Sequence, residues 1–270
     1  MQCYKSSMQS LPEPIRSLSN ALLQRVRALA GGSGEGEILL EGRRLIADAI
    51  SAGVLPTEIL VRADRLDEVE AWLSMGDRVR PVAPKVYARL GSVKNPPPVM
   101  ALAPIPSARG LGDLKAAGAP LVLVVAGVSD PGNLGALARS AEAAGASALI
   151  QLQGGVSPWN PRALRGSMGS LLRLPVVLQS NAEQVAQGLS AAGFRHVVAA
   201  TRGGATPQTT DWSGPIALWV CAETGDAPSV CEGMQGVTIP LAAPVESLNV
   251  TVATSLLLFA AGRVGGDGRE

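Results

Sequence analysis

Apolar runs alternate with amphipathic stretches along the second half of the chain. The run at 121–125, Leu-Val-Leu-Val-Val, has no polar position, which is typical of a strand buried on both faces of a parallel sheet. Beyond it, the spacing of Leu137, Ala138 and Ala141 predicts a helix over 134–144. The same pattern predicts further strands at 148–151, 175–178, 196–200, 216–220 and 236–240, and helices at 161–171, 181–192 and 248–262. Strands that alternate with helices indicate an α/β fold with a mostly parallel sheet covered on both faces.

The first part of the chain shows a similar pattern on a smaller scale. We expect an amphipathic helix after Pro14, a strand followed by a helix that ends at Gly53, and strands at 58–61 and 99–103 with a further strand and short helix between them. Residues 95–120 are rich in Pro, Gly and Ala, which indicates a linker. The sequence therefore predicts a small N-terminal α/β domain at 1–105, of which 1–34 are a leader and a helix, a linker at 106–118, and a larger α/β domain at 119–270.

Composition supports a folded protein with an aliphatic core. Of 270 residues, 47% are hydrophobic and 17% charged, but only 3% are aromatic, so the core must consist mainly of Leu, Val, Ile and Ala. The net charge of +1 argues against non-specific coating of nucleic acid. The first 110 residues nevertheless hold 14 Lys and Arg against 11 Asp and Glu, which weakly favours an anionic partner for the first domain.

The cysteines and the apolar runs bear on the compartment. Cys3, Cys221 and Cys231 match neither a disulfide framework nor a zinc-ligand spacing, so we expect no metal site and a reducing environment, the cytoplasm. No early stretch has the order of a signal peptide. The longest apolar run, near the C-terminus, is too short to span a bilayer and is better interpreted as a buried helix.

Neither the single histidine nor the glycine-rich loop matches a familiar catalytic or nucleotide-binding pattern. His196 begins a predicted strand with no acid or nucleophile nearby in the sequence, so we expect a structural role for it. The loop at 129–135, Ser-Asp-Pro-Gly-Asn-Leu-Gly, matches neither G-x-G-x-x-G nor the P-loop. The strand that ends in Ala-Leu-Ile-Gln-Leu-Gln also lacks the acidic residue of a dinucleotide fold, which disfavours a Rossmann-type dehydrogenase.

Three separated stretches each begin at the end of an apolar strand and carry a few polar residues. They read NLGALARSAEAAGA, ALWVCAETGDAP and IPLAAPVESLNVTVATSLLLFAA, and their polar residues are Asn133 and Arg139; Glu223; and Glu246, Ser247 and Asn249. The carboxyl ends of parallel strands are where α/β proteins bind ligands, so these loops are candidate sites. Taken singly, each residue also has a local explanation, such as a helix cap at Asn133, Ser247 or Asn249.

Together the three stretches resemble the signature motifs of the SpoU/TrmH family of RNA ribose 2′-O-methyltransferases, within the SPOUT superfamily. NLGALAR matches the family's Asn-x-Gly-x-x-x-Arg, CAE matches the region around its second-motif glutamate, and IPLxxxVESLNVTVA matches its third motif nearly throughout. RALRGSMGSLLRLPVV is similar to the family's linking segment, and LLEGRRLIADAISAG resembles its N-terminal domain of ribosomal protein L30e type. The resemblance extends over about residues 35–262.

The resemblance implies a fold and a cofactor. The fold would be a C-terminal SPOUT domain whose chain forms a trefoil knot, one of the rare exceptions to the rule against threaded chains, preceded by the small L30e-like domain. S-adenosylmethionine (AdoMet) would bind in the knot, mainly through backbone groups. Carried over by motif, the cofactor-binding residues are Thr201, Cys221, Ala222, Ile239 and Leu248.

The resemblance also implies a reaction at the 2′-hydroxyl of a ribose in RNA. Of the RNAs that the family modifies, 23S rRNA is the expected substrate. A hydroxyl is far too weak an acid to ionise near neutral pH, so the site must favour the developing alkoxide. Arg139 would do so while it holds an RNA phosphate. Asn133 and Asn249 would orient the ribose or the arginine, Glu223 would brace the site, and Ser247 would add a hydrogen bond.

Two partners follow from the same resemblance. Family members are homodimers, so a second copy would pack on the alanine-rich faces at 136–148 and 250–261. The first domain would bind RNA phosphates through Arg43, Arg44, Arg62 and Arg65.

Two positions depart from the family pattern. Cys221 and Ala243 stand where the family has glycine, whose missing side chain lets the backbone approach the cofactor closely. A noncatalytic RNA-binding or ribosome-assembly protein on the same fold is therefore an alternative, as is an enzyme that methylates tRNA. Affinity for AdoMet separates the noncatalytic protein from either enzyme.

Overall fold

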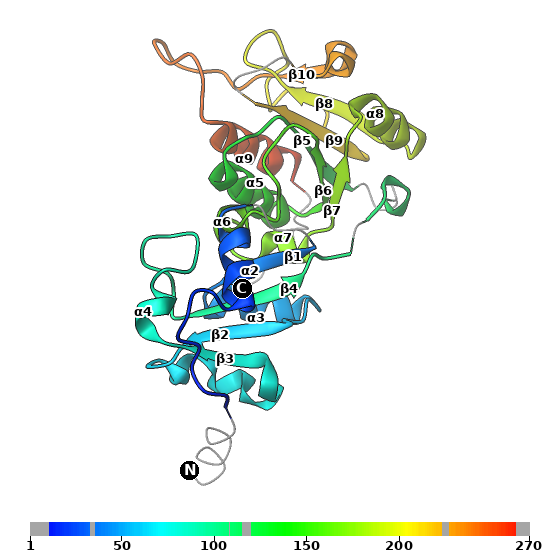
Figure 1. The fold of residues 1–270 in the computed structure, drawn as a ribbon. Helices are drawn as coiled ribbons and strands as arrows, with labels where there is room; N and C mark the ends of the chain where they lie inside the picture. The colour runs from blue at the N-terminus through cyan, green and yellow to red at the C-terminus, as the bar shows by residue number, and fades with distance from the viewer. Residues whose placement is uncertain (1–10, 33–35, 108, 115–119, 223–226, 263–270) are drawn as a thin grey trace, which may run out of the picture. The chain divides into compact units, whose positions relative to one another are not determined.

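The structure, a computed structural model, describes residues 11–32, 36–107, 109–114, 120–222 and 227–262 (Figure 1). Packing divides the chain into two units. The first extends to Pro106 and includes Trp159–Arg173, and the second consists of Ser107–Pro158 and the chain from Leu174 onward.

A four-stranded sheet forms the centre of the first unit. β4 runs antiparallel to β1 and β2, while β2 and β3 are parallel, which gives the strand order β1-β4-β2-β3. The strands are β1 (Glu37–Glu41), β2 (Glu58–Arg62), β3 (Val79–Val82) and β4 (Val99–Pro104). The helices are α2 (Ala21–Ala30), α3 (Arg43–Ser51), α4 (Pro84–Tyr87) and the 3-10 segment η1 (Leu66–Arg78). Of these elements, only η1 has no counterpart among those predicted from the pattern.

The helix α2 closes one side of this unit's core. It begins after Asn20, whose side chain caps it, and it buries Leu23, Val26 and Leu29 on one face. These side chains pack with Leu39 of β1 in one hydrophobic cluster.

The segment Trp159–Arg173 corrects two expectations. It was predicted as one helix, at 161–171, within the second domain, but it forms α6 (Pro161–Gly166) and α7 (Ser170–Arg173) and packs with the first unit. The helix breaks because Met168 and Gly169 both have positive φ, 50° and 88°, which a right-handed helix cannot accommodate.

A buried carboxylate explains why this segment packs with the first unit. The Glu41 side chain is fully buried at the end of β1 and forms a salt bridge with Arg165 of α6. It also accepts hydrogen bonds from the backbone N–H and the hydroxyl of Ser92, at 2.7 and 2.5 Å. A buried carboxylate is tolerated only when it is paired and hydrogen-bonded in this way, so the ion pair fixes α6 beside β1.

A six-stranded parallel sheet forms the centre of the second unit. Its strand order is β10-β8-β9-β5-β6-β7, and every pairing is parallel. The strands are β5 (Leu121–Ala126), β6 (Ala146–Leu152), β7 (Val176–Gln179), β8 (Arg195–Ala199), β9 (Ile216–Cys221) and β10 (Gln235–Val237). The helices are α5 (Pro131–Ala143), α8 (Ala182–Ala191) and α9 (Val250–Ala261), with short 3-10 turns η2 (Leu111–Asp113) and η3 (Ser229–Gly233).

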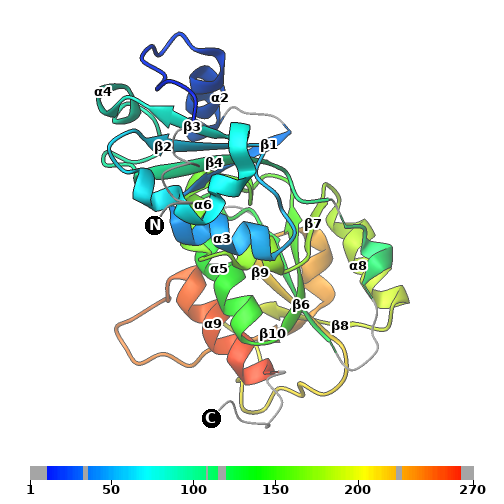
Figure 2. The same cartoon turned by 90° about the horizontal axis from the view of Figure 1, so that it is seen from below.

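Helices cover both faces of this sheet, as the alternating pattern predicted. α5 and α9 lie side by side on one face, and α8 lies on the other (Figure 2). The central strand β5 is buried along its whole length, which agrees with its uninterrupted apolar sequence. The mostly parallel α/β class is therefore confirmed, whereas the trefoil knot that the resemblance implies stays a prediction.

The described residues contain neither a helix that could span a membrane nor a cluster of metal-binding side chains. No described helix is both long and apolar enough to cross a membrane. No group of three or more His, Cys, Asp or Glu side chains in the described part of the chain could hold a metal ion.

Candidate functional site

A large cavity lies in the second unit, beyond the carboxyl ends of β8, β9 and β10. Its volume is about 700 Å³, and its walls come from those strands, from the segment before α9 and from the first turns of α9. All five residues predicted to bind the cofactor line it, namely Thr201, Cys221, Ala222, Ile239 and Leu248. The structure thus brings together residues that are up to 47 positions apart in the sequence.

The lining of this cavity suits AdoMet. Its volume lies within the range of small-molecule sites. Val250 and Leu257 would supply apolar surface for an adenosine. The Thr201 hydroxyl and the Glu246 carboxylate would supply polar contacts, and the carboxylate has the right charge for a sulfonium. The residues present therefore fit the cofactor that the motifs imply.

The two departures from the family's glycines leave this cavity open. Ala243 is exposed and does not line the cavity, so its methyl group takes no volume from it. Cys221 does line it, but its thiol interacts with that of Cys231 on the same wall. This hydrogen bond lowers the pKa of the Cys221 thiol and raises that of Cys231.

Residues of the first and third motifs meet where α5 and α9 begin. Asn249 caps α9 by accepting from the backbone N–H of Thr251 at 2.9 Å, and its amide donates to Asn133 Oδ1 at 3.4 Å. The Thr251 hydroxyl also lies 3.3 Å from Asn133 Oδ1. Two asparagines that are 116 residues apart in the chain therefore form one polar cluster.

Capping at α5 differs from the local explanation considered for Asn133. Asp130 is the N-cap, and its side chain accepts from the Asn133 backbone N–H at 2.8 Å. Asn133 consequently lies inside the first turn, and its side chain is available to Asn249. The helix also begins three residues earlier than predicted, because Pro131 is well suited to the first helical position.

Three hydroxyl residues of this region were not singled out from the sequence. Thr251 contacts Asn133, and one turn further along α9 Ser255 donates to the Ser140 hydroxyl of α5 at 2.7 Å. The spacing of Thr251 and Ser255, four residues apart in a helix whose only other polar residue is Thr254, is the signal that could have identified them.

The remaining predicted catalytic residues are placed differently. Arg139 lies on an exposed part of α5, and it forms no hydrogen bond or salt bridge with another described residue. It does not line the cofactor cavity, whereas Ser247 does. Glu223 lies outside the described residues.

His196 lies in a structural hydrogen-bond network. Its Nδ1 accepts from the indole N–H of Trp219 at 3.0 Å, so the neutral ring carries its proton on Nε2, which lies 2.9 Å from the Ser190 hydroxyl. Burial lowers the pKa of His196 below its ordinary value of 6.5. The residue is thus held neutral between β8, β9 and α8, in agreement with the structural role expected for it.

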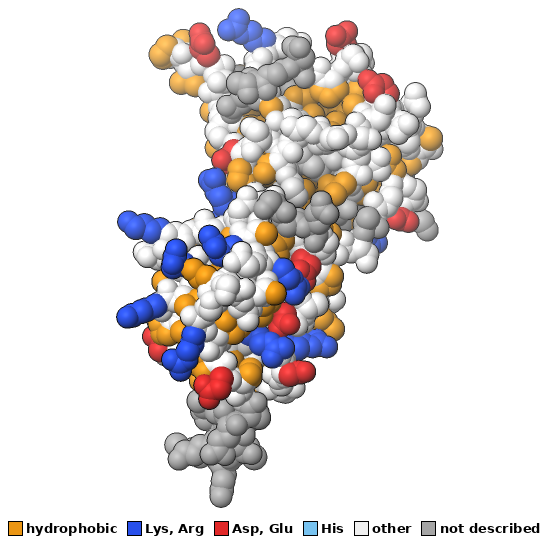
Figure 3. All heavy atoms as spheres, viewed as in Figure 1, with side chains coloured by type: hydrophobic (Ala, Val, Ile, Leu, Met, Phe, Trp, Pro, Cys, Tyr) orange, Lys and Arg blue, Asp and Glu red, His pale blue; other side chains and the backbone are white. Residues whose placement is uncertain are grey.

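The four arginines predicted to bind RNA fall into two pairs. Arg43 and Arg44 are exposed in the first turn of α3 and form no salt bridge with another described residue. Arg62 instead pairs with Asp64 at 2.6 Å, and Arg65 pairs with two neighbouring carboxylates. Figure 3 shows Lys and Arg side chains over much of the visible surface of this unit.

Comparison with known proteins agrees with the motifs. The model of the SpoU rRNA Methylase family matches residues 120–259. The chain is 30% identical over 223 residues to the 23S rRNA (guanosine(2553)-2′-O)-methyltransferase RlmP of Bacillus subtilis (strain 168), covering 82% of this chain and 86% of that protein.

Two solved structures share the fold. An AdoMet-bound rRNA methyltransferase from Sinorhizobium meliloti is 26% identical, with a TM-score of 0.82 and coverage of 92% of this chain and 97% of that one. The SpoU methyltransferase AviRb from Streptomyces viridochromogenes, in complex with the cofactor AdoMet, is 28% identical, with a TM-score of 0.80 and coverage of 90% and 97%. The resemblance inferred from the three motifs is therefore confirmed, and the chain belongs to the SpoU rRNA Methylase family.

Proposed function

We propose that this protein transfers the methyl group of AdoMet to the 2′-hydroxyl of a ribose in 23S rRNA. The observation that carries the proposal is the cavity of about 700 Å³ lined by all five motif-derived cofactor residues. The similarity to RlmP, whose name gives 23S rRNA as its substrate, favours this RNA over tRNA. The open cavity favours an enzyme over a noncatalytic assembly protein, which has no need of it.

The chain's own residues would orient the ribose and favour loss of its proton. AdoMet supplies an electrophilic methyl group when it is bound. Asn133 and Asn249 share one hydrogen bond, and their remaining donor and acceptor capacity is available to ribose hydroxyls. Arg139, which has no described partner, would hold a phosphate beside the developing alkoxide, and its positive charge would stabilise that alkoxide. Ser247, in the cavity wall, would add a hydrogen bond, and Glu223 would brace the site.

The first unit would hold the RNA by its phosphates. Arg43 and Arg44 are the best placed of the four predicted arginines, because neither forms a salt bridge with a described carboxylate. Arg62 and Arg65 would contribute less, since each must share its charge with an adjacent acid. The expected compartment is the cytoplasm, where the three cysteines would stay reduced.

A homodimer would cover the apolar surface of α9. Val252, Leu256 and Phe259 lie on one face of this helix and are 49%, 50% and 57% exposed. Exposed apolar side chains gathered on one face are typical of protein interfaces. The dimer would also place Arg139 of each chain beside a second copy, which accounts for its lack of contacts within one chain.

The test is methyl transfer from labelled AdoMet to unmodified 23S rRNA, 16S rRNA and tRNA. We expect label in 23S rRNA, at one ribose that becomes resistant to alkaline cleavage. Label only in tRNA would assign the enzyme to that substrate. No label in any RNA, together with no AdoMet binding by calorimetry, would support the noncatalytic alternative.

A further inference from the structure

A second cavity of about 350 Å³ lies in the second unit, over the carboxyl ends of β5, β6 and β9. Three residues, Cys221, Ala222 and Pro228, line both this cavity and the larger one. The two cavities are therefore neighbours with a shared wall, and a ligand in the second would lie next to a bound cofactor. The second motif stretch accounts only for this shared wall, and none of the motifs accounts for the rest of the second cavity.

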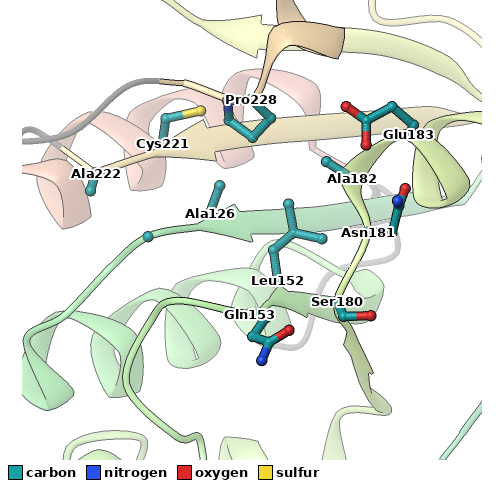
Figure 4. A pocket seen from close by; sticks show the side chains of 11 residues that line it. Ala126, Leu152, Gln153, Ser180, Asn181, Ala182, Glu183, Cys221, Ala222 and Pro228 are labelled. Carbon is teal, nitrogen blue, oxygen red and sulfur yellow. The ribbon is translucent and has the colours of Figure 1, made fainter.

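The lining of the second cavity does not suit an anion. None of its lining residues is Lys, Arg or His, and Glu183 is the only charged one among the described residues that form it. Ala126 and Leu152 provide an apolar surface between the shared wall and the start of α8 (Figure 4). A neutral group with an apolar face and hydrogen-bond donors matches this lining better than a phosphate does.

Glu183 has acceptor capacity to offer such a group. In Figure 4 its carboxylate points toward the middle of the cavity. One oxygen, Oε1, accepts from the Ser229 hydroxyl at 3.3 Å, a long hydrogen bond. The carboxylate has about four lone-pair sites, so this contact leaves both oxygens able to accept more.

We propose that this cavity binds an unpaired guanine of the RNA substrate and that Glu183 accepts from its Watson–Crick edge. Guanine presents two adjacent donors there, N1–H and N2–H₂, which match the two oxygens of one carboxylate, whereas adenine, cytosine and uracil each present donors on a single atom. Enzymes that modify RNA commonly read a splayed-out base in this way. This inference rests on the proposed function, and it agrees with the guanosine in the name of RlmP.

Binding of nucleosides tests the cavity independently of catalysis. Saturation-transfer NMR of the full chain with guanosine, inosine and adenosine compares bases that differ at this edge, since inosine lacks the N2 amino group. We expect guanosine to bind about tenfold more tightly than inosine, because one hydrogen bond to a charged acceptor is lost. Glu183→Gln should remove this preference, and Glu70→Gln, at an exposed glutamate of the first unit, should not.

Several outcomes would overturn the inference. It fails if no guanosine binding is detected, if guanosine and inosine bind equally, or if Glu183→Gln leaves the preference unchanged. Weaker AdoMet binding in Glu183→Gln, measured by calorimetry, would instead assign the carboxylate to the cofactor. An equal loss for every nucleoside would indicate that Glu183 acts only as the first-turn acid of α8.

Methyl transfer then distinguishes this inference from the proposed function. If no RNA accepts a methyl group while guanosine preference depends on Glu183, the proposed function fails and the guanine site stands. If an RNA is methylated, replacing its reacting or adjacent guanine by inosine should lower kcat/KM about tenfold in wild type and have no further effect in Glu183→Gln. An equal decrease in both proteins would show that the base is recognised elsewhere.

Discussion

In the proposed mechanism, Arg139 stabilises the developing alkoxide. It has no partner among the described residues. Arg139→Ala should therefore lower kcat for methyl transfer by about 100-fold or more, the usual effect of removing one group that stabilises developing negative charge. Arg139→Lys keeps the charge but not the planar fork, so its loss should be smaller. Single-turnover transfer to the substrate RNA measures both effects.

Replacing Arg139 should lower the rate of methyl transfer but not the affinity for AdoMet. Because this residue does not line the cofactor cavity, Arg139→Ala should bind AdoMet with wild-type affinity in calorimetry. Arg27→Ala, at an exposed arginine of α2, is the matched control and should retain normal activity. Wild-type kcat in Arg139→Ala would exclude a catalytic role for the arginine.

The lowered pKa of His196 predicts how the stability of the protein depends on pH. Its folded pKa lies below 6.5, so at mildly acidic pH the unfolded chain binds more protons than the folded one. The free energy of unfolding should therefore fall as the pH decreases from about 7 to about 5. Urea unfolding at several pH values should show this step in wild type and a smaller decrease in His196→Gln. Identical pH profiles for the two proteins would contradict the assignment.

At the scale of secondary-structure elements, the salt bridge between Arg165 of α6 and the buried Glu41 can be tested. Arg165→Leu would leave the Glu41 carboxylate buried without its cation, and we expect a loss of about 3 kcal/mol in the free energy of unfolding. Glu41→Gln in the same chain removes that charge, so the double variant should be more stable than Arg165→Leu alone. Urea denaturation of the two single variants and the double variant measures the coupling. Additive losses would show that the salt bridge does not hold α6 in place.

Helix α3 provides a test of RNA binding. If Arg43 and Arg44 contact phosphates, Arg43→Ala with Arg44→Ala should weaken binding and reduce the slope of log K against log salt by about 1 to 2. Arg62→Ala with Arg65→Ala removes the same charge from residues already paired with carboxylates, and should change the slope less. Filter binding of substrate RNA at several salt concentrations compares the two variants. An unchanged slope in the Arg43 and Arg44 variant would exclude α3 from the RNA surface.

The pattern of apolar and polar positions predicts an element well where residues close in the sequence determine it. β5 and β9 are buried on both faces, and continuous apolar sequence is enough to identify them. The start of α5 was placed three residues late, because apolar spacing begins after the cap at Asp130. The segment at 159–173 was misassigned because a contact between Glu41 and Arg165, 124 residues apart, determines where it packs. No local pattern contains that information.

For the whole chain, recognition of the site depended on motifs rather than on periodicity. The five cofactor residues come from three separate segments, and only the resemblance linked them before the structure placed them in one cavity. Thr251 and the second cavity escaped prediction because their roles follow from packing between segments. The pairing of Arg62 and Arg65 with carboxylates was likewise visible only in the fold, although the acids are close in sequence.

The proposed homodimer predicts that AdoMet binding and methyl transfer can be separated. The cofactor cavity is formed within one chain, whereas Arg139 faces outward, so a monomer should bind AdoMet but transfer methyl groups poorly. Leu256→Glu with Phe259→Glu would place carboxylates in the α9 interface, which costs several kcal/mol when they are desolvated without partners. Light scattering should then show a monomer.

The matched control replaces an exposed leucine outside the proposed interface by glutamate. Leu55 is 53% exposed on the first unit, against 50% for Leu256 on α9. Leu55→Glu should therefore leave the protein dimeric and active, because it introduces the same charge at similar exposure outside the proposed interface. A monomeric wild-type protein with full activity would refute the dimer. A dimer that survives the two α9 substitutions would place the interface elsewhere on the chain.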